Sequence, residues 1–462
     1  MTDGAGKAPE VSIILPVYNA EEFLDEAFHS ILEQSFLQKG GHLEVSIFDD
    51  GSHDRSAEIV EQWRRQLTEA YPDTLRFTVG TNTARLEAAR RGERRNEAYA
   101  KEDGSQLPAA AEEAASCALC RRRAPFEELQ AKKASSKKDE KLYCKTCCAL
   151  SKEEWQQKRR EVYTEKMSRN QGYGGSASTA LPANGVPCGI GFACNSAVQQ
   201  SSGEFLCRFD ADDVMYPERI QLQIEALRAL PSEHQDRTLV GTGFVRMPED
   251  ATPRYTGWLN GMTDDQLTSQ RFREVTLLHP TWMYHRRIWE RVGGYTQDTA
   301  VGEDIVFFHK HLEADGLLLR VPRPLLRYRC HPGQRSWRLP RRAVQAAKVA
   351  AFQRQILVVE PWNRGFGVLG AGRDARDFVK ALSDDARKLV TEFYEVDKNK
   401  WGKWISVAQA DGSLFHMPIV PQQWLRTPFV VCVALERGFG VIEAIKRDAP
   451  AAREGVDYFH LV

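Results

Sequence analysis

The spacing of apolar residues along the chain predicts alternating strands and helices. Residues 11–17 form a continuous apolar run rich in β-branched side chains, which is typical of a buried parallel strand. Helical spacing follows at 21–34, and two further strand and helix patterns lie at 43–48 and 54–67. A third strand pattern covers 75–79. Strands that alternate with helices indicate an α/β fold with a mostly parallel, Rossmann-like sheet covered on both faces.

The same alternation returns in the second half of the chain. The expected helices lie at 189–198, 303–313 and 340–359, and the expected strands begin or lie at 205–209, 237–247, 276–284 and 325–330. Another strand followed by a helix is expected around 366–372. Between these two halves, from 82 to 187, strand patterns vanish and charged residues dominate.

These changes divide the chain into five expected segments. They are an N-terminal nucleotide-binding part (10–81), a charged insertion (82–187), a continuation of the first domain (188–337), a helical connector (338–360) and a Rossmann-like C-terminal domain (361–462). The insertion holds 21 Lys and Arg against 15 Asp and Glu, a net charge of +6.

Charge and hydropathy limit the class of protein. Lys and Arg total 63, as do Asp and Glu, which argues against a surface coated with positive charge for non-specific nucleic-acid binding. The N-terminal residues lack the apolar core of a secretory signal, and no run reaches the roughly 18 apolar residues that span a bilayer. We therefore expect a cytoplasmic protein with no membrane partner.

One acidic cluster carries the strongest chemical signal. An apolar strand pattern runs into Asp210, Asp212 and Asp213, which places three carboxylates within four residues. Such a cluster suits a hard divalent cation, Mg²⁺ or Mn²⁺, that also coordinates a phosphate of the substrate. The alternative is an acidic helix cap, because a helix signal begins at Pro217. A second acidic pair, Asp49 and Asp50, ends another strand, where an ordinary turn is the alternative.

Five segments in order resemble the family 2 glycosyltransferases, which have the GT-A fold. They are Leu-Pro-Val-Tyr-Asn at 15–19, Phe-Asp-Asp-Gly-Ser-His-Asp at 48–54, Asp-Ala-Asp-Asp at 210–213, Gly-Glu-Asp at 302–304 and Tyr-Arg-Cys-His at 328–331. The resemblance implies a GT-A domain, a nucleotide-sugar donor and inversion at the anomeric carbon.

The resemblance also implies roles for individual residues. Donor-binding residues would be Pro16, Tyr18, Asn19, Asp49, Asp50 and Asp210, with Tyr18 stacking on the base. Metal ligands would be Asp210, Asp212 and His331, although His331 could equally lie in a surface loop. Asp304 would be the catalytic base, preceded by Glu303, although both acids also suit a helix N-terminus. His279 and Trp282 would line the acceptor side, although core packing explains Trp282 equally well.

Three further segments resemble one eukaryotic branch of that family. Residues 278–282, together with 428–433 and 457–461, are similar to the queuosine-tRNA galactosyltransferases, formerly described as β-1,3-N-acetylglucosaminyltransferase-like proteins. This implies UDP-galactose as donor and queuosine in tRNA as acceptor. The alternatives are transfer of N-acetylglucosamine from UDP-GlcNAc to a glycan, and a catalytically silent binding or scaffold protein.

The resemblance covers the chain nearly end to end, except for the central insertion. Cys117, Cys120, Cys144 and Cys147 form two CxxC pairs whose spacing suits a structural Zn²⁺ site, with unliganded thiols as the alternative. The insertion's net charge permits RNA contact, but a solvated insert explains it as well. Near the C-terminus, Gly370-Ala-Gly372 follows a strand pattern, which favours a half-Rossmann packing or docking module over an NAD-dependent oxidoreductase.

Overall fold

The computed structural model describes residues 8–82, 187–433 and 440–461, and within the insertion the backbone of four short strands. The chain divides into two compact units, one formed by Met1–Glu87 with Asn184–Val462 and the other by Ala88–Ala183. Among the described residues of the second unit, two antiparallel hairpins pair β4 with β5 and β6 with β7. Their bounds are β4 (Ala114–Ser116), β5 (Arg123–Pro125), β6 (Leu129–Lys133) and β7 (Glu140–Cys144).

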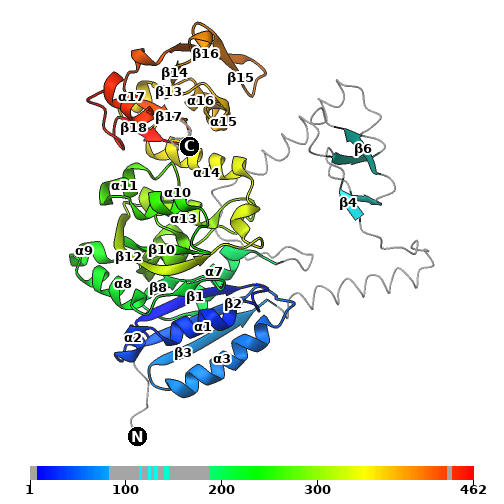
Figure 1. Ribbon diagram of the computed structural model, residues 1–462, viewed down its shortest axis with the longest axis vertical. Helices are drawn as coiled ribbons and strands as arrows, with labels where there is room; N and C mark the ends of the chain where they lie inside the picture. Colours follow the sequence, from blue (N-terminus) through cyan, green and yellow to red (C-terminus); the bar gives the residue numbers. More distant parts are fainter. Residues whose placement is uncertain are drawn as a thin grey trace. The chain divides into compact units, whose positions relative to one another are not determined.

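The first sheet of the larger unit has eight strands in the order β3-β2-β1-β8-β11-β10-β12-β9 (Figure 1). Their bounds are β1 (Val11–Val17), β2 (Leu43–Asp49), β3 (Leu75–Thr81), β8 (Phe205–Arg208), β9 (Val214–Met215), β10 (Thr238–Met247), β11 (Met283–His285) and β12 (Leu317–Arg329). Only β9 and β11 run opposite to their neighbours, so the sheet is mostly parallel. The α/β architecture expected from the sequence is confirmed, and it is consistent with a GT-A domain.

Helices cover both faces of this sheet. The helices of this part are α1 (Leu24–Leu32), α2 (Ser35–Gln38), α3 (Ser56–Ala70), α7 (Ile190–Gln200), α8 (Arg219–Arg228), α9 (Ser232–Gln235), α10 (Pro253–Asn260), α11 (Asp264–Ser269), η2 (His279–Thr281), α12 (Arg286–Val292), α13 (Glu303–Glu313), η3 (Arg335–Trp337) and α14 (Arg341–Gln355). Phe28 of α1 packs between Trp63 of α3 and Phe77 of β3 on one face. Val45 of β2 pairs with Phe77 in register, and the next side chain along β2, Ser46, points to the other face. There the Ser46 hydroxyl donates to the Ala197 carbonyl of α7.

The direction of the strands fixes where a site can form. Because β1, β2, β8, β10 and β12 run parallel, their carboxyl ends share one edge of the sheet. Asp49 ends β2, the acidic cluster follows β8, and His331 follows β12. Three segments far apart in sequence therefore meet at this edge, as the strand pattern predicts.

Two local predictions are wrong. Residues 276–284 do not form one strand, because Pro280 lies in η2 and only Met283–His285 pair with their neighbours. Burial explains the apolar run, since Leu277 and Leu278 are both buried outside any strand. Asp213 is also not a helix cap, because α8 begins at Arg219 with Glu218 as its N-cap residue.

The C-terminal part forms a second sheet of six strands in the order β15-β16-β14-β13-β17-β18. Its strands are β13 (Phe366–Leu369), β14 (Val390–Glu395), β15 (Trp404–Ala408), β16 (Leu414–Pro421), β17 (Phe429–Val431) and β18 (Tyr458–His460). Its described helices are η4 (Trp362–Arg364), α15 (Arg373–Ala381), α16 (Asp384–Arg387), η5 (Lys398–Lys400), η6 (Gln422–Trp424) and α17 (Val441–Asp448). Phe352 of α14 joins the core of this sheet by packing against Phe366, Phe378 and Phe459.

Membrane-spanning helices are absent from the described part of the chain, where each helix is too short or too polar to cross a bilayer.

Candidate active site

The acidic cluster lies in the turn after β8. One carboxylate oxygen from each of Asp210, Asp212 and Asp213 lies within 4.8 Å of the others. Asp213 is fully buried, and its Oδ1 accepts a hydrogen bond of 2.9 Å from the Arg329 backbone N–H. Burial, followed by the charges of Asp212 and Asp210, raises the pKa of Asp213 well above its ordinary value. The cluster is therefore costly to ionise unless positive charge lies beside it.

A divalent cation fits this cluster. Asp213 Oδ2 is buried and accepts no hydrogen bond from any described residue. Carboxylate oxygens are the ligands that Mg²⁺ and Mn²⁺ prefer. An orphaned carboxylate oxygen beside two further acids is thus a donor set that a hard cation would complete.

A buried arginine lies on the strand that delivers the cluster. Arg208 is the last residue of β8, is 1% exposed, and forms an ion pair through Nη2 with Asp210 Oδ1. Burial raises the pKa of the Asp210 carboxyl, and the Arg208 charge lowers it. Arg208 therefore occupies one oxygen of Asp210 and leaves the other for a ligand.

The segment after β12 closes onto the cluster. His331 Nε2 lies 2.9 Å from Asp212 Oδ2, so the two residues predicted to share a metal are in direct contact. The Phe23 ring packs against His331 with 4.9 Å between ring centroids, and the Arg329 guanidinium lies 5.1 Å from the Phe23 ring centroid. His331 is thus held at the site rather than in an unconstrained surface loop.

Asp49 and Asp50 differ sharply in their contacts. Asp49 Oδ1 accepts from Gly51 N (3.1 Å), Ser52 N (2.8 Å) and Ser52 Oγ (2.7 Å), which is the turn expected as the alternative. Asp49 Oδ2 accepts no hydrogen bond within the part of the chain that the structure describes. This second oxygen therefore remains available as a hydrogen-bond acceptor.

Both carboxylate oxygens of Asp50, a predicted donor-binding residue, accept hydrogen bonds from within the protein. Its Oδ1 accepts from Cys188 N and Asn82 Nδ2, both at 3.1 Å. Its Oδ2 accepts from Gly189 N at 2.7 Å. Asn82 and Cys188 lie at the two ends of the insertion. Asp50 therefore connects the point where the chain leaves β3 with the point just before α7.

The remaining predicted donor residues lie in or beside the first loop. Tyr18 follows β1 and is 45% exposed, so its ring face is available for stacking. Asn19 adopts the left-handed conformation (φ 49°), and its Oδ1 accepts from His53 N at 2.8 Å. Pro16 is buried inside β1 opposite Phe48. Asn19 and Pro16 therefore shape the loop that presents Tyr18.

The two acids at the start of α13 have different environments. Asp304 is half-buried, and burial followed by the Glu303 charge raises its pKa to about 7. Glu303 is buried, with Oε2 3.5 Å from Arg335 Nη2 and Oε1 3.8 Å from His279 Nδ1. Burial raises the pKa of Glu303, and the Arg335 charge opposes this. Asp304 is thus the more accessible acid, with a pKa suited to a base at neutral pH.

The two predicted acceptor-side residues are largely inside the protein. Trp282 is fully buried and donates from Nε1 to the Leu277 carbonyl at 2.8 Å, so it belongs to the core and cannot line an acceptor surface. His279 is 7% exposed and lies 3.3 Å from the Tyr295 hydroxyl. Burial lowers the pKa of His279 well below its ordinary value, which makes it a neutral support for Glu303.

Three arginines at the site are missing from the sequence prediction. Arg208, Arg329 and Arg335 respectively contact Asp210, the Asp212 carbonyl and Glu303. A charged residue at the end of an otherwise apolar strand was a usable signal for Arg208. Arg329 and Arg335 lie in a segment whose polar residues predict exposure, so the sequence carries no such signal for them.

The predicted zinc residues lie outside this description. Cys117, Cys120 and Cys147 fall outside the described residues, and only the backbone of Cys144 is described. The zinc site therefore stays a prediction.

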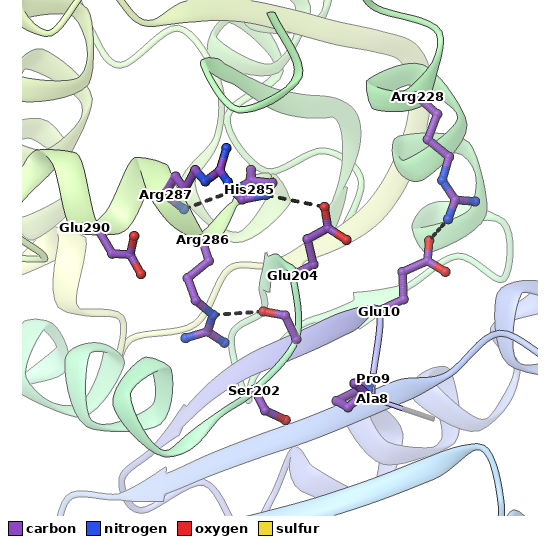
Figure 2. Close-up of a pocket in the computed structure, with 11 residues that line it drawn as sticks. Ala8, Pro9, Glu10, Ser202, Glu204, Arg228, His285, Arg286, Arg287 and Glu290 are labelled. Atoms are coloured by element: carbon purple, nitrogen blue, oxygen red, sulfur yellow. Dashed lines mark hydrogen bonds and ion pairs between the residues drawn. The ribbon is translucent and has the colours of Figure 1, made fainter. Parts of the chain in front are cut away.

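A hollow of about 540 Å³ lies at the opposite, amino-terminal edge of the first sheet (Figure 2). It is lined by residues that precede β1 and β8 and by the start of α12. Its charges pair within the protein, as Arg228 does with Glu10 and His285 with Glu204 (Figure 2). This hollow is separate from the acidic cluster.

Comparison with known proteins shows that part of the chain is similar to glycosyltransferases. Residues 12–92 and 186–293 match the family model "Glycosyl transferase family 2". Among curated proteins, the chain is 33% identical over 95 residues to the putative teichuronic acid biosynthesis glycosyltransferase TuaG of Bacillus subtilis, covering 21% of this chain and 36% of TuaG. It is 38% identical over 56 residues to the poly(ribitol-phosphate) beta-N-acetylglucosaminyltransferase TarS of Staphylococcus aureus, covering 12% of this chain and 9% of TarS. The matches thus span about a third or less of these relatives.

Solved structures give more extended but weaker matches. S. aureus TarS 1-349 in complex with UDP aligns with a TM-score of 0.42 and 14% identity, over 83% of this chain and 84% of that chain. The mannosyltransferase PcManGT from Pyrobaculum calidifontis, in complex with GDP-Man and Mn²⁺, aligns with a TM-score of 0.40 and 17% identity, over 76% and 67%. The family match includes Asp49 and the acidic cluster, whereas Asp304 and His331 follow it. Residues 12–92 and 186–293 are therefore similar to the glycosyltransferases of family 2.

Proposed function

We propose that this chain is a metal-dependent, inverting glycosyltransferase that transfers a hexose from a UDP-sugar to an acceptor hydroxyl. The observation that carries the proposal is the acidic cluster after β8, which shares a sheet edge with Asp49 and contacts His331. Asp304 supplies the base, because its raised pKa of about 7 lets it accept a proton at neutral pH.

The reaction is a single displacement. Asp304 takes the proton of the acceptor hydroxyl while that oxygen attacks the anomeric carbon. The bond from that carbon to the UDP oxygen breaks, and its electron pair leaves with UDP. One attack from the face opposite the leaving group inverts the anomeric configuration, so an α-linked donor gives a β-linked product. Glu303 is a positioning residue that forms an ion pair with Arg335. The negative charge of Glu303 also raises the pKa of Asp304.

The metal would be held by Asp210 and Asp212, with His331 beside them. When bound, Mn²⁺ or Mg²⁺ supplies Lewis-acid neutralisation of the departing diphosphate. Asp213 Oδ1 accepts from the Arg329 backbone N–H, and its Oδ2, which has no hydrogen-bond partner among the described residues, would add a third carboxylate oxygen to this site.

The uridine would lie between Tyr18 and Asp49. The exposed Tyr18 ring offers a stacking face, and Asp49 Oδ2 would accept the imide N–H. Asp49 Oδ1 is anchored in its turn, which fixes the direction of the second oxygen.

The resemblance of 278–282, 428–433 and 457–461 to the queuosine-tRNA galactosyltransferases supports UDP-galactose as donor and queuosine in tRNA as acceptor. The name of TarS supports a second candidate, transfer of N-acetylglucosamine from UDP-GlcNAc.

The test is incubation of the full chain, Mn²⁺ and queuosine-containing tRNA with UDP-galactose, UDP-glucose and UDP-GlcNAc in parallel, followed by mass analysis of the nucleosides. We expect queuosine to gain one hexose with UDP-galactose alone. A gain of N-acetylhexosamine would support the second candidate. No gain with any donor would defeat the tRNA assignment and leave the transferase class standing.

A further inference from the structure

One long segment of the chain contains no acidic residue. From 316 to 359 there is no Asp or Glu, whereas the segment holds nine arginines and one lysine. The chain as a whole has equal numbers of basic and acidic residues, so this segment is a local concentration of positive charge. It covers the whole of β12, the turn with His331, η3 and α14.

Its middle part is fixed to the candidate active site at two points. His331 Nε2 lies 2.9 Å from Asp212 Oδ2, and Arg335 Nη2 lies 3.5 Å from Glu303 Oε2. Gln334 lies between His331 and Arg335 in the sequence and holds the turn together, because its Nε2 donates to the Arg329 carbonyl at 2.7 Å. The segment thus runs from the metal side of the site to the residue beside the base.

The next part of the segment turns its side chains to solvent. Trp337 is 64% exposed, although its Nε1 donates to Gln334 Oε1 at 3.1 Å. Arg338 and Arg342 are exposed and form no ion pair with any residue in the described ranges. An exposed indole flanked by unpaired guanidinium groups therefore lies immediately beyond the site.

The start of α15 extends this surface. Arg341 Nη2 forms an ion pair of 2.7 Å with Asp374 Oδ1, which brings the first turns of α14 and α15 together. Asp374 also lies 3.5 Å from Arg373 and offsets part of the charge. Arg376, one turn further along α15, is exposed and has no ion-pair partner in the described part of the chain.

We propose that Trp337, Arg338, Arg342 and Arg376 form a docking surface for a nucleic-acid acceptor, with the arginines on its phosphates and the indole on an unstacked base. This rests on the proposed function only for the identification of the neighbouring site as the place of transfer. All the cations on the surface are arginines, whose planar groups pair with phosphate oxygens through two hydrogen bonds and stack on bases. Exposed tryptophan provides the sequence-tolerant stacking face that single-stranded regions require.

The test measures binding of a fluorescein-labelled RNA stem-loop by anisotropy over a series of salt concentrations. The variant is Arg338→Gln/Arg342→Gln/Arg376→Gln. The matched control is Arg65→Gln/Arg76→Gln/Arg364→Gln, which removes the same charge from exposed positions elsewhere. UDP affinity, measured on the same samples, reports whether the donor site stays folded.

We expect the surface variant to bind the RNA about tenfold or more weakly, and to lower the slope of log K against log salt by about 2, since each phosphate contact on a single strand contributes about 0.7. Trp337→Ala should weaken RNA binding about fivefold and leave binding of heparin, a polyanion without bases, unchanged. UDP affinity should not change.

Equal losses in the surface and control variants would overturn the proposal. So would equal losses of RNA and heparin binding in Trp337→Ala, because that result describes a general polyanion surface or one for an acidic protein. RNA binding that depends on these arginines, in a protein that transfers no sugar, would leave the docking surface standing and overturn only the proposed function.

Discussion

At the scale of single residues, the pair Glu303-Asp304 separates two tasks that adjacent carboxylates could share. Glu303 is buried against Arg335 and His279, whereas Asp304 is half-buried at the same helix start. The raised pKa of Asp304 follows from burial and from the negative charge beside it. A base with a pKa near 7 combines a useful unprotonated fraction with good proton affinity.

The pH dependence of the rate tests this assignment. Asp304 acts only when it is unprotonated, so kcat/KM should fall about tenfold per pH unit below about 7 and level off above it. Glu303→Gln removes the charge that raises the pKa of Asp304, and the inflection should therefore move to lower pH. The measurement is a pH profile of kcat/KM with saturating Mn²⁺.

Glu69→Gln serves as the control, because Glu69 is exposed on α3 and its substitution removes the same charge from the molecule. Its profile should match that of the unmodified chain. An inflection that stays in place in Glu303→Gln, or moves upward, would contradict the coupling between the two acids.

Other residues show what the sequence could and could not predict. Adjacent aspartates at a strand end predict a polar turn or a ligand contact. Asp49 forms the turn with Ser52, whereas Asp50 accepts a hydrogen bond from Cys188 N. The partners of Asp50 lie more than a hundred residues away at 188–189, and no local pattern predicts them. Trp282 was ambiguous for a similar reason, since its ring packs against Phe307 and Phe308 of α13, which lie about 25 residues further along the chain.

At the scale of elements, close packing of α7 against the loop before α13 positions the start of α13, where Asp304 lies. A Cβ on Gly191 would lie 2.0 Å from the Thr296 carbonyl oxygen and 3.4 Å from the Glu303 Cβ. Glycine is needed here because the backbone of the 295–302 loop approaches the helix so closely. The position of Asp304 therefore depends on a residue that takes no part in the reaction.

Gly191→Ala should force α7 and this loop apart. We expect a loss of stability of about 1 to 3 kcal/mol from overpacking, and a lower kcat, because the base shifts relative to the acidic cluster. Thermal unfolding and steady-state rates measure the two effects.

Gly257→Ala is the matched control. Gly257 lies in α10, and a Cβ there meets no atom within 4 Å, so the substitution should be neutral or stabilise the helix by up to about 1 kcal/mol. Similar behaviour of the two variants would argue against the close approach at Gly191.

Elements with strong periodicity were predicted well. The helix expected at 303–313 is observed at Glu303–Glu313, and the strand expected at 11–17 is observed at Val11–Val17. The expected strand at 325–330 is the end of a longer strand, Leu317–Arg329, whose first half carries charged and exposed residues. Half-buried strands lose the continuous apolar run on which such a prediction depends.

At the scale of the whole molecule, sheet topology assembles the site. Strand direction alone places the ends of β2, β8 and β12 on one edge, which is why the order of motifs predicted a common site. The contacts among arginines and acids at that edge required the structure. The two ends of the insertion are also held together, since Asp50 accepts hydrogen bonds from both Asn82 and Cys188.

The C-terminal sheet supports packing or docking over dinucleotide chemistry. Glu395 ends β14, where a ribose-binding acid would lie in a dinucleotide fold. Its Oε2 instead accepts from Lys400 Nζ at 2.8 Å, and its Oε1 accepts from Val396 N at 3.0 Å and Asp397 N at 3.2 Å. With both oxygens used within the protein, the carboxylate offers little to a ribose.

The central claim is that Asp304 is the base of a metal-dependent sugar transfer at the acidic cluster. The most direct measurement is UDP release from a UDP-hexose and acceptor tRNA, in the unmodified chain and in Asp304→Asn, with Mn²⁺ and with EDTA. We predict turnover only in the unmodified chain with Mn²⁺, and a loss of at least about 100-fold in Asp304→Asn with unchanged UDP affinity. Equal turnover in the variant, or full turnover in EDTA, would contradict the account.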